Sequence, residues 1–170
     1  MASVVNKIIV IIVAGMVALV IWYVAVPFMK DLQQGSLEQQ VTIEALSDEK
    51  NPVAMTVGTS TIYAEIVATD DERAKGLSGR FFIGDEEGML FVFREPGYHA
   101  IWMKDMLFPI DIAWLDKDFK IIDIEREVSP STYPSSFSPQ APATYVLEVN
   151  AGFFEEKGIS IGNTFQLKAE

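Results

Sequence analysis

Two carboxylates that interrupt apolar runs are the strongest chemical signals in the sequence. Asp111 lies within PIDIAWL, and Glu148 lies within YVLEV. Such a carboxylate needs a cation or hydrogen-bond donors, because burial otherwise keeps it protonated at a cost of several kcal/mol. We expect Asp111 to pair with Lys104 or Arg80. That pair either fixes the register of a strand or faces a ligand.

The same region offers an aromatic wall beside charged groups, which is the composition of a small-ligand pocket. The candidate ligand-binding residues are Arg80, Trp102, Lys104, Asp111 and Glu148, with Arg73, Met103 and Asp105 as secondary candidates. Two facing carboxylates are the minimum for glycoside hydrolysis or aspartic-type chemistry. Nothing in the spacing of Asp111 and Glu148 places them face to face, so enzymatic use of this pair stays an alternative.

Metal and cofactor chemistry finds little support in the sequence. His99 is the single histidine and there is no cysteine, whereas zinc and copper sites usually use several imidazoles or thiolates. We find no phosphate-binding glycine loop, zinc-protease helix, nucleophile elbow or dinucleotide fingerprint. The sequence therefore predicts no metal and no cofactor, and it favours a binding protein over an enzyme.

The elements that would position these residues are short strands. From Pro52 onward, apolar or alternating runs recur with turn signals between them, a pattern typical of an antiparallel sheet. We predict a mainly β (α+β) domain with a compact, barrel-like or sandwich-like antiparallel sheet. The turn at residues 116–118 should join two of its strands as a hairpin.

One or two short helices and one long loop should interrupt the strands. Thr69 and Glu72 have the spacing of a capping box, and Gly76 is placed to end the helix that it begins. A second short helix is predicted at AGFFEEKG. Residues 129–142 contain four prolines and five serines, so they should cross the surface as a tethered loop or as a lid, pinned by Tyr133 and Phe137.

The amino-terminal part has a different composition. Residues 8–29 contain no charged side chain, and as a helix these 22 residues would span roughly 33 Å, which matches the hydrocarbon thickness of a bilayer. A cleaved signal peptide is the alternative, but its apolar region is usually shorter. We predict an anchor at residues 1–30, a polar stalk at residues 31–51 and a globular domain at residues 52–170.

The charge distribution bears on partners and location. Without Lys7 and Lys30, 11 basic residues face 24 acidic ones, so the chain after the anchor has a net charge of about −13. Such a surface repels phosphate backbones and argues against a nucleic-acid partner. The charges flanking the apolar run favour the amino terminus inside. We therefore expect a single-pass protein of the cell membrane with its carboxy-terminal domain outside the cytoplasm.

Several blocks, in their order, are similar to a known family. They are ERAKGLSGR, GMLFVF, IWMKDMLFPIDIAWLD, YVLEVNAGF and GISIGN, and the match as a whole extends over roughly residues 53–168. They resemble the uncharacterised family called domain of unknown function 192, whose members often carry an amino-terminal signal or anchor. The chain departs from the family pattern at Asp105 and Met106, where asparagine and threonine are usual, and at Asn163, where aspartate is usual.

The resemblance implies a compact, β-rich domain outside the cytoplasm, and it supplies no reaction. Its pattern falls on Arg73, Gly76, Leu77, Arg80, residues 88–91, Trp102, Met103, Lys104, Pro109, Asp111, Leu147, Glu148 and Gly152. We therefore expect a membrane-anchored module that binds a small molecule or a cell-envelope protein without catalysis. The alternatives are a carboxylate-dependent hydrolase or lyase and a purely structural envelope scaffold.

Overall fold

The computed structural model describes residues 16, 22–27, 29–30 and 52–168, and the chain divides into two units at residues 1–41 and 42–170. In the first unit the described residues are helical. Within the described parts of the chain, no helix is both long enough and apolar enough to cross a membrane. The predicted anchor at residues 1–30 lies mostly outside the described residues, and the predicted stalk at residues 31–51 lies wholly outside them.

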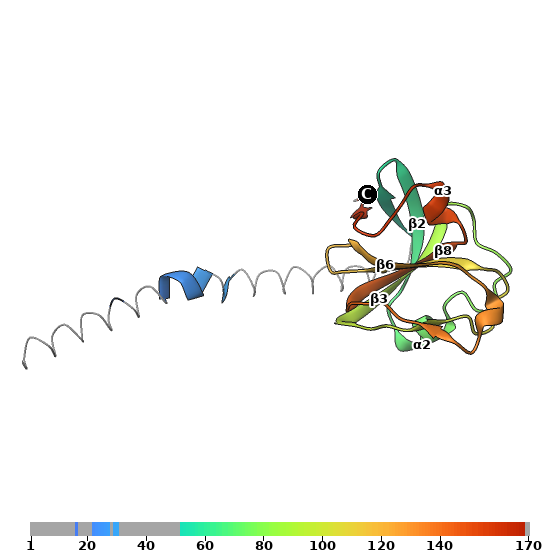
Figure 1. Cartoon of the computed structure of the whole chain (residues 1–170), viewed down its shortest axis with the longest axis horizontal. Coiled ribbons are helices and arrows are strands. Elements are labelled where there is room, and N and C mark those ends of the chain that lie inside the picture. Colours follow the sequence, from blue (N-terminus) through green and yellow to red (C-terminus); the bar gives the residue numbers. More distant parts are fainter. Residues whose placement is uncertain (1–15, 17–21, 28, 31–51, 169–170) are drawn as a thin grey trace, which may run out of the picture. The chain divides into compact units, whose positions relative to one another are not determined.

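A seven-stranded sheet dominates the second unit, and its strand order is β6-β5-β8-β3-β2-β1-β9 (Figure 1). The strands are β1 (Val53–Val57), β2 (Ser60–Val67), β3 (Glu87–Gly97), β5 (Ile110–Leu115), β6 (Ile121–Val128), β8 (Ala143–Asn150) and β9 (Gln166–Leu167). Two short strands, β4 (Ile101–Trp102) and β7 (Ser136–Phe137), pair with each other. The helices are α2 (Asp70–Lys75), the 3-10 helix η1 (Pro130–Thr132) and α3 (Phe153–Glu156).

The prediction of a mainly β domain with a few short helices is confirmed, but the sheet is open rather than a closed barrel or a two-sheet sandwich. Its two ends in the strand order nevertheless approach each other. The amide of Ile121 donates to the carbonyl of Asn163 at 2.8 Å, and the amide of Phe165 donates to the carbonyl of Phe119 at 3.0 Å. The segment before β9 thus covers backbone groups that a free edge strand would expose.

The sheet is not purely antiparallel, which corrects the prediction. β2 and β3 run parallel, with Ala64 opposite Gly88, and α2 lies in the connection between them. A parallel pair needs a long crossover, and residues 68–86 supply one. The capping box that begins α2 is confirmed, since Thr69 and Glu72 exchange both side-chain hydrogen bonds, and Gly76 ends the helix.

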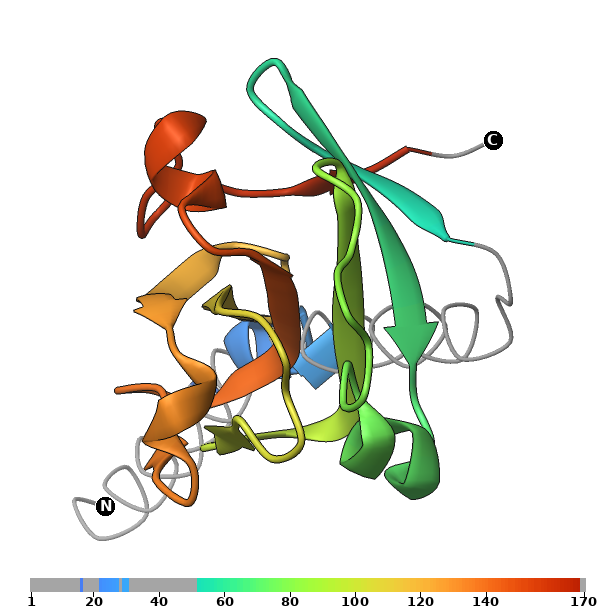
Figure 2. The same cartoon turned by 90° about the vertical axis from the view of Figure 1, so that its right-hand side faces the viewer.

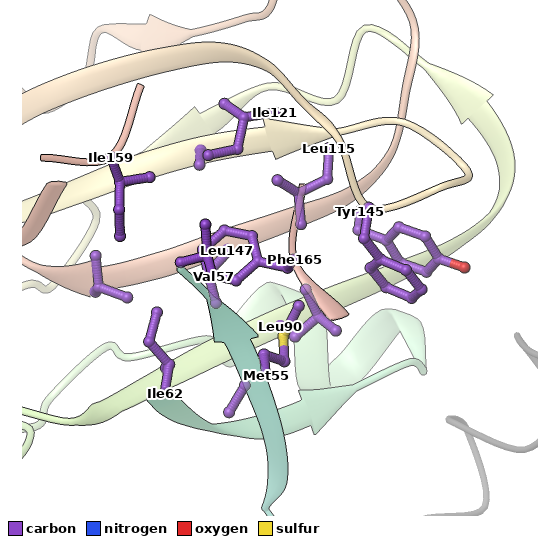
Figure 3. Packing of buried hydrophobic residues seen from close by; sticks show 14 of the residues in the cluster. Met55, Val57, Ile62, Leu90, Leu115, Ile121, Tyr145, Leu147, Ile159 and Phe165 are labelled. Carbon is purple, nitrogen blue, oxygen red and sulfur yellow. The ribbon is translucent and has the colours of Figure 1, made fainter. Parts of the chain in front are cut away.

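Two apolar cores lie on the two faces of the sheet, because neighbouring residues of a strand point to opposite faces. The first core, seen in Figure 3, is formed by Met55, Ile62, Leu90, Leu115, Tyr145, Leu147 and Phe165 with their neighbours. The second core is formed by Leu77, Met89, Phe91, Met103, Ile110, Ile112, Trp114 and Val146 with their neighbours. α2 and α3 lie far apart in both views (Figures 1 and 2). The turn after α2 supplies Leu77 to the second core, whereas α3 belongs to the first core.

The predicted hairpin and the long loop are both present. β5 and β6 are antiparallel, and Asp116 accepts hydrogen bonds from the amides of Asp118 at 2.9 Å and Lys120 at 3.0 Å inside the turn. Residues 129–142 contain η1 and β7. Tyr133 packs edge-on against Trp102 at 6.0 Å between ring centroids, and Phe137 packs against the second core. The two predicted aromatic residues therefore hold the loop down.

Candidate functional site

A cleft of about 270 Å³ opens on the face of the sheet that carries the second core. Its walls come from α2 and the turn after it, from β3, from β4 and the residue before it, from the segment up to the start of β5, and from β8. The lining residues are Arg73, Ala74, Lys75, Gly76, Leu77, Ser78, Phe91, Phe93, Ala100, Ile101, Trp102, Met106, Ile110 and Glu148. The volume is close to the lower end of the range for small-molecule sites, about 300 to 1,000 Å³.

Glu148 is the buried charged group of this cleft. It lies on β8 between Met89 of β3 and Ile112 of β5, and only 4% of it is exposed. Within residues 52–168, its carboxyl group has neither a hydrogen-bond donor nor a cation as a partner. Burial therefore raises the pKa of Glu148 to about 8. A buried carboxyl group without a partner is unfavourable for the fold and points to a role in binding.

Aromatic side chains form much of the wall and the rim. Phe91 is buried, whereas Trp102 is 52% exposed at the mouth. The ring of Tyr133 packs against Trp102. The ammonium nitrogen of Lys104 lies 5.8 Å from the ring centroid of Trp102. These contacts restrict the Trp102 side chain at the rim. A ligand can therefore pack against its ring with a small loss of side-chain entropy.

Arg73 lines the cleft, but its guanidinium group already has partners. It donates to the carbonyls of Ala68 and Val92, the latter at 2.9 Å, and forms an ion pair with Asp70. The guanidinium carbon also lies 5.0 Å from the ring centroid of Phe93. These contacts fix α2 against β3. Arg73 is therefore a structural brace of the cleft wall.

Asp111 lies on the other face of the sheet, and the predicted ion pair with Lys104 or Arg80 is wrong. Its side chain is fully buried and accepts hydrogen bonds from the amides of Glu127 at 2.8 Å and Phe154 at 3.2 Å. Backbone donors from the bulged end of β6 and from the start of α3 thus take the place of a cation. Asp111 ties three elements together and has no contact with the cleft.

The other predicted residues also lie outside the cleft lining. Arg80 pairs with Glu65 at 2.7 Å on the surface, and α2 ends before it. Met103 is buried in the second core, and Lys104 is exposed next to the cleft mouth. Asp105 has a positive φ of 56°, a conformation that aspartate and asparagine both tolerate. Of the five primary candidates, the structure brings only Trp102 and Glu148 together.

His99 supports the cleft wall from outside. Its ring stacks on Phe93 at 3.5 Å between centroids, and its Nε2 lies 3.1 Å from the carbonyl oxygen of Glu95. Burial, followed by the nearby charge of Arg73, lowers the pKa of His99. In the described part of the chain, no three histidine, cysteine, aspartate or glutamate side chains come together as a potential metal site.

Among the described residues, the Tyr145 hydroxyl is the one fully buried side-chain polar atom without a hydrogen-bond partner. Its ring stacks on Phe119 at 4.4 Å between centroids, inside the first core, and burial raises the pKa of its hydroxyl to about 12 (Figure 3). Tyr145 does not line the cleft, which distinguishes it from Glu148.

Sequence reasoning missed most of the cleft wall. Gly76 was predicted as the end of a helix, and no binding role was predicted for Leu77, Ser78, Phe91, Met106 or Ile110. None of these residues is charged. The sequence signal for this wall was Glu148, a single charge in an apolar strand. Asp111 gives the same signal, and only the strand register shows which of the two faces the cleft.

Comparisons with known proteins agree with this fold. The family model DUF192, described as Uncharacterized ACR, matches residues 53–167. A crystal structure of a protein of unknown function from Novosphingobium aromaticivorans is 32% identical, with a TM-score of 0.62, over 68% of this chain and 83% of that one. A Sinorhizobium meliloti protein, described as a candidate transcription regulator, is 27% identical, with a TM-score of 0.65, over 70% of this chain and 94% of that one.

A search of curated proteins finds no match. The family match spans most of the chain and includes every wall of the cleft, from Arg73 to Glu148. Similar solved structures carry the same architecture. This chain belongs to the DUF192 family.

Proposed function

We propose that this protein is a membrane-anchored module that binds a small molecule in the cleft above Glu148. The observation that carries the proposal is the buried carboxyl group of Glu148, which has no partner within residues 52–168 and lines an open cleft. Folding alone gains nothing from such a group, since an apolar side chain of similar size would be more favourable. A bound ligand supplies the missing partner.

Binding is favoured over catalysis because the cleft contains a single carboxyl group. The second buried carboxylate, Asp111, is on the opposite face of the sheet and uses both its oxygens on backbone amides. General acid and base chemistry with two carboxylates needs both at one site. A role as a regulator that binds nucleic acid is also disfavoured, because the net charge of about −13 repels phosphate.

Retention of ligands from a metabolite extract tests the binding role. The full chain in lipid nanodiscs is incubated with the extract and washed, and the retained molecules are identified by mass spectrometry. Ala74→Trp places a large ring in the cleft wall, whereas Thr59→Trp places it in the exposed turn between β1 and β2. We expect wild type and Thr59→Trp to retain the same molecule and Ala74→Trp to lose it. Equal retention by all three proteins would contradict the proposal.

The proposed location is supported by the uncharged run at residues 8–29 and is tested separately. The chain has no cysteine, so single cysteines report accessibility without background. We expect Ser131→Cys, in the exposed part of the long loop, to react with a membrane-impermeant maleimide on intact cells. Ser3→Cys should react only after lysis. The reverse pattern would overturn the proposed orientation.

A further inference from the structure

The distribution of charge within the cleft is uneven. Its buried end holds the carboxyl group of Glu148 between the apolar side chains of Met89 and Ile112. The charged residues that face the cleft, Arg73 and Lys75, both come from α2, and Lys75 is exposed. No charged group from β3 or β5 lines the cleft. Glu148 is therefore the one acidic residue of the lining, and of the two basic residues Lys75 lies towards solvent.

The aromatic walls favour a positively charged ligand group. Phe91 and Trp102 line the cleft with aromatic rings, and the face of an aromatic ring attracts cations. The ring of Phe93 is already in contact with His99 and Arg73. An anionic ligand group would find no available cation at depth, since the Arg73 guanidinium is bound to two carbonyls and to Asp70. A ligand with a positive charge, in contrast, meets Glu148 and the rings together.

The size of the cleft limits what accompanies the charge. Its volume of about 270 Å³ lies near the lower end of the range for small-molecule sites. This size favours a small ligand over a folded peptide segment.

From these features we infer that the cleft binds a primary amine on a small apolar body, with its ammonium group paired to Glu148 and its body against the aromatic wall. This inference rests on the proposed function and names its ligand class. Because burial raises the pKa of Glu148 to about 8, its carboxyl group is mostly protonated at pH 7 when no ligand is bound. Binding of an ammonium group to the carboxylate therefore releases a proton.

Calorimetry with three probes of nearly equal shape tests the class. Benzylamine, benzyl alcohol and benzoate are titrated into the full chain in nanodiscs at pH 7, in buffers that differ in ionisation enthalpy. We expect benzylamine to bind with release of a proton, and we expect the neutral and anionic probes to bind at least about tenfold more weakly. Glu148→Gln should weaken benzylamine about tenfold or more and abolish proton release. Glu125→Gln makes the same substitution at an exposed residue of β6 and should alter neither.

A failure of the amine inference can be distinguished from a failure of the proposed binding site. If benzyl alcohol or benzoate binds best and Ala74→Trp abolishes that binding, the cleft is a ligand site but the amine class is wrong. If no probe is affected by Ala74→Trp, the proposed site itself is wrong. Equal benzylamine binding by wild type and Glu148→Gln overturns the inference.

Amines also occur as lipid headgroups. A comparison of nanodiscs with and without an amine headgroup therefore tests whether the bound amine is a lipid or a free small molecule. Discs of phosphatidylglycerol contain no amine, whereas discs that include phosphatidylethanolamine do. Weaker benzylamine binding in the second kind of disc identifies the headgroup as the source of the amine. Equal binding in both identifies a free small amine.

Discussion

Glu148 lies opposite Ile112 on β5, while the neighbouring Asp111 lies opposite Val149 on β8. These two pairs are adjacent along β5 and β8, and side chains of adjacent pairs point to opposite faces of a sheet. The buried carboxylates of Asp111 and Glu148 therefore lie on opposite faces. Asp111 is enclosed by backbone amide donors, and Glu148 faces an open cleft with no donor among the described residues. The same residue class thus stabilises the fold on one face and is available for a ligand on the other.

Glu148→Gln should make the protein more stable above neutral pH. The pKa of Glu148 rises from 4.5 to about 8 on folding, so between these values the folded protein holds a proton that the unfolded chain has lost. Stability therefore falls as pH rises through this window, by up to about 1.4 kcal/mol per unit. Urea unfolding of both proteins at about pH 5 and pH 8 measures this. We expect a gain of a few kcal/mol for the variant at the higher pH, and equal pH dependence would contradict the account.

Asp111→Asn should destabilise the fold without affecting the cleft. Asparagine has one carbonyl oxygen where the carboxylate offers two, so the amide of Glu127 or Phe154 loses its acceptor, at a cost of about 2 kcal/mol or more. Asp105→Asn is the matched control, because its side chain is exposed and asparagine tolerates the positive φ at this position. Urea midpoints compare the two. A loss of ligand retention in folded Asp111→Asn would place this residue in the site after all.

Gly88→Ala should disturb the strand that carries Glu148. A Cβ at this position would lie 2.9 Å from the carbonyl oxygen of Glu148 and 3.1 Å from a methyl carbon of Ile62. Neither neighbour is the free end of a flexible chain, so we expect a loss of about 1 to 3 kcal/mol. Gly84→Ala meets only the side chain of Glu87, which can move, and should cost less than about 1 kcal/mol. Similar unfolding free energies for the two variants would argue against this close approach.

Arg73→Lys should loosen the cleft wall, since an ammonium group does not reproduce a planar fork that serves two carbonyls and a carboxylate. We expect a loss of about 1 to 3 kcal/mol. Arg80→Lys affects a single exposed pair with Glu65 and should change stability by less than about 0.5 kcal/mol. Thermal or urea unfolding separates the two. Equal effects would show that Arg73 is not the brace that its contacts indicate.

Local signals in the sequence predicted the local structure well. Thr69 and Glu72 specify the start of α2 through backbone chemistry within four residues, and residues 116–118 specify a turn in the same way. The parallel pairing of β2 and β3 escaped prediction because strand direction depends on the crossover that contains α2, and no residue within either strand encodes it.

The lining of the cleft could also be predicted only in part, because it depends on long-range contacts that local sequence signals do not specify. Glu148 and Trp102 were identified by a charge and a ring in unusual surroundings, and both line the cleft. Asp111 gave an equally strong signal but belongs to the other face, and the turn at residues 76–78 gave none. Which of two buried carboxylates faces a cleft is decided by register and by the elements that cover each face. Those are long-range properties of the fold.

The titration of Glu148 itself is the most direct test. The full chain with ¹³C-labelled glutamate is followed by NMR across pH in nanodiscs without amine headgroups, and the Glu148 carboxyl signal is assigned by its absence in Glu148→Gln. The account predicts a midpoint near 8 without ligand and a lower midpoint in saturating benzylamine. A midpoint near the ordinary value of about 4.3, or one that benzylamine leaves unchanged, would contradict it.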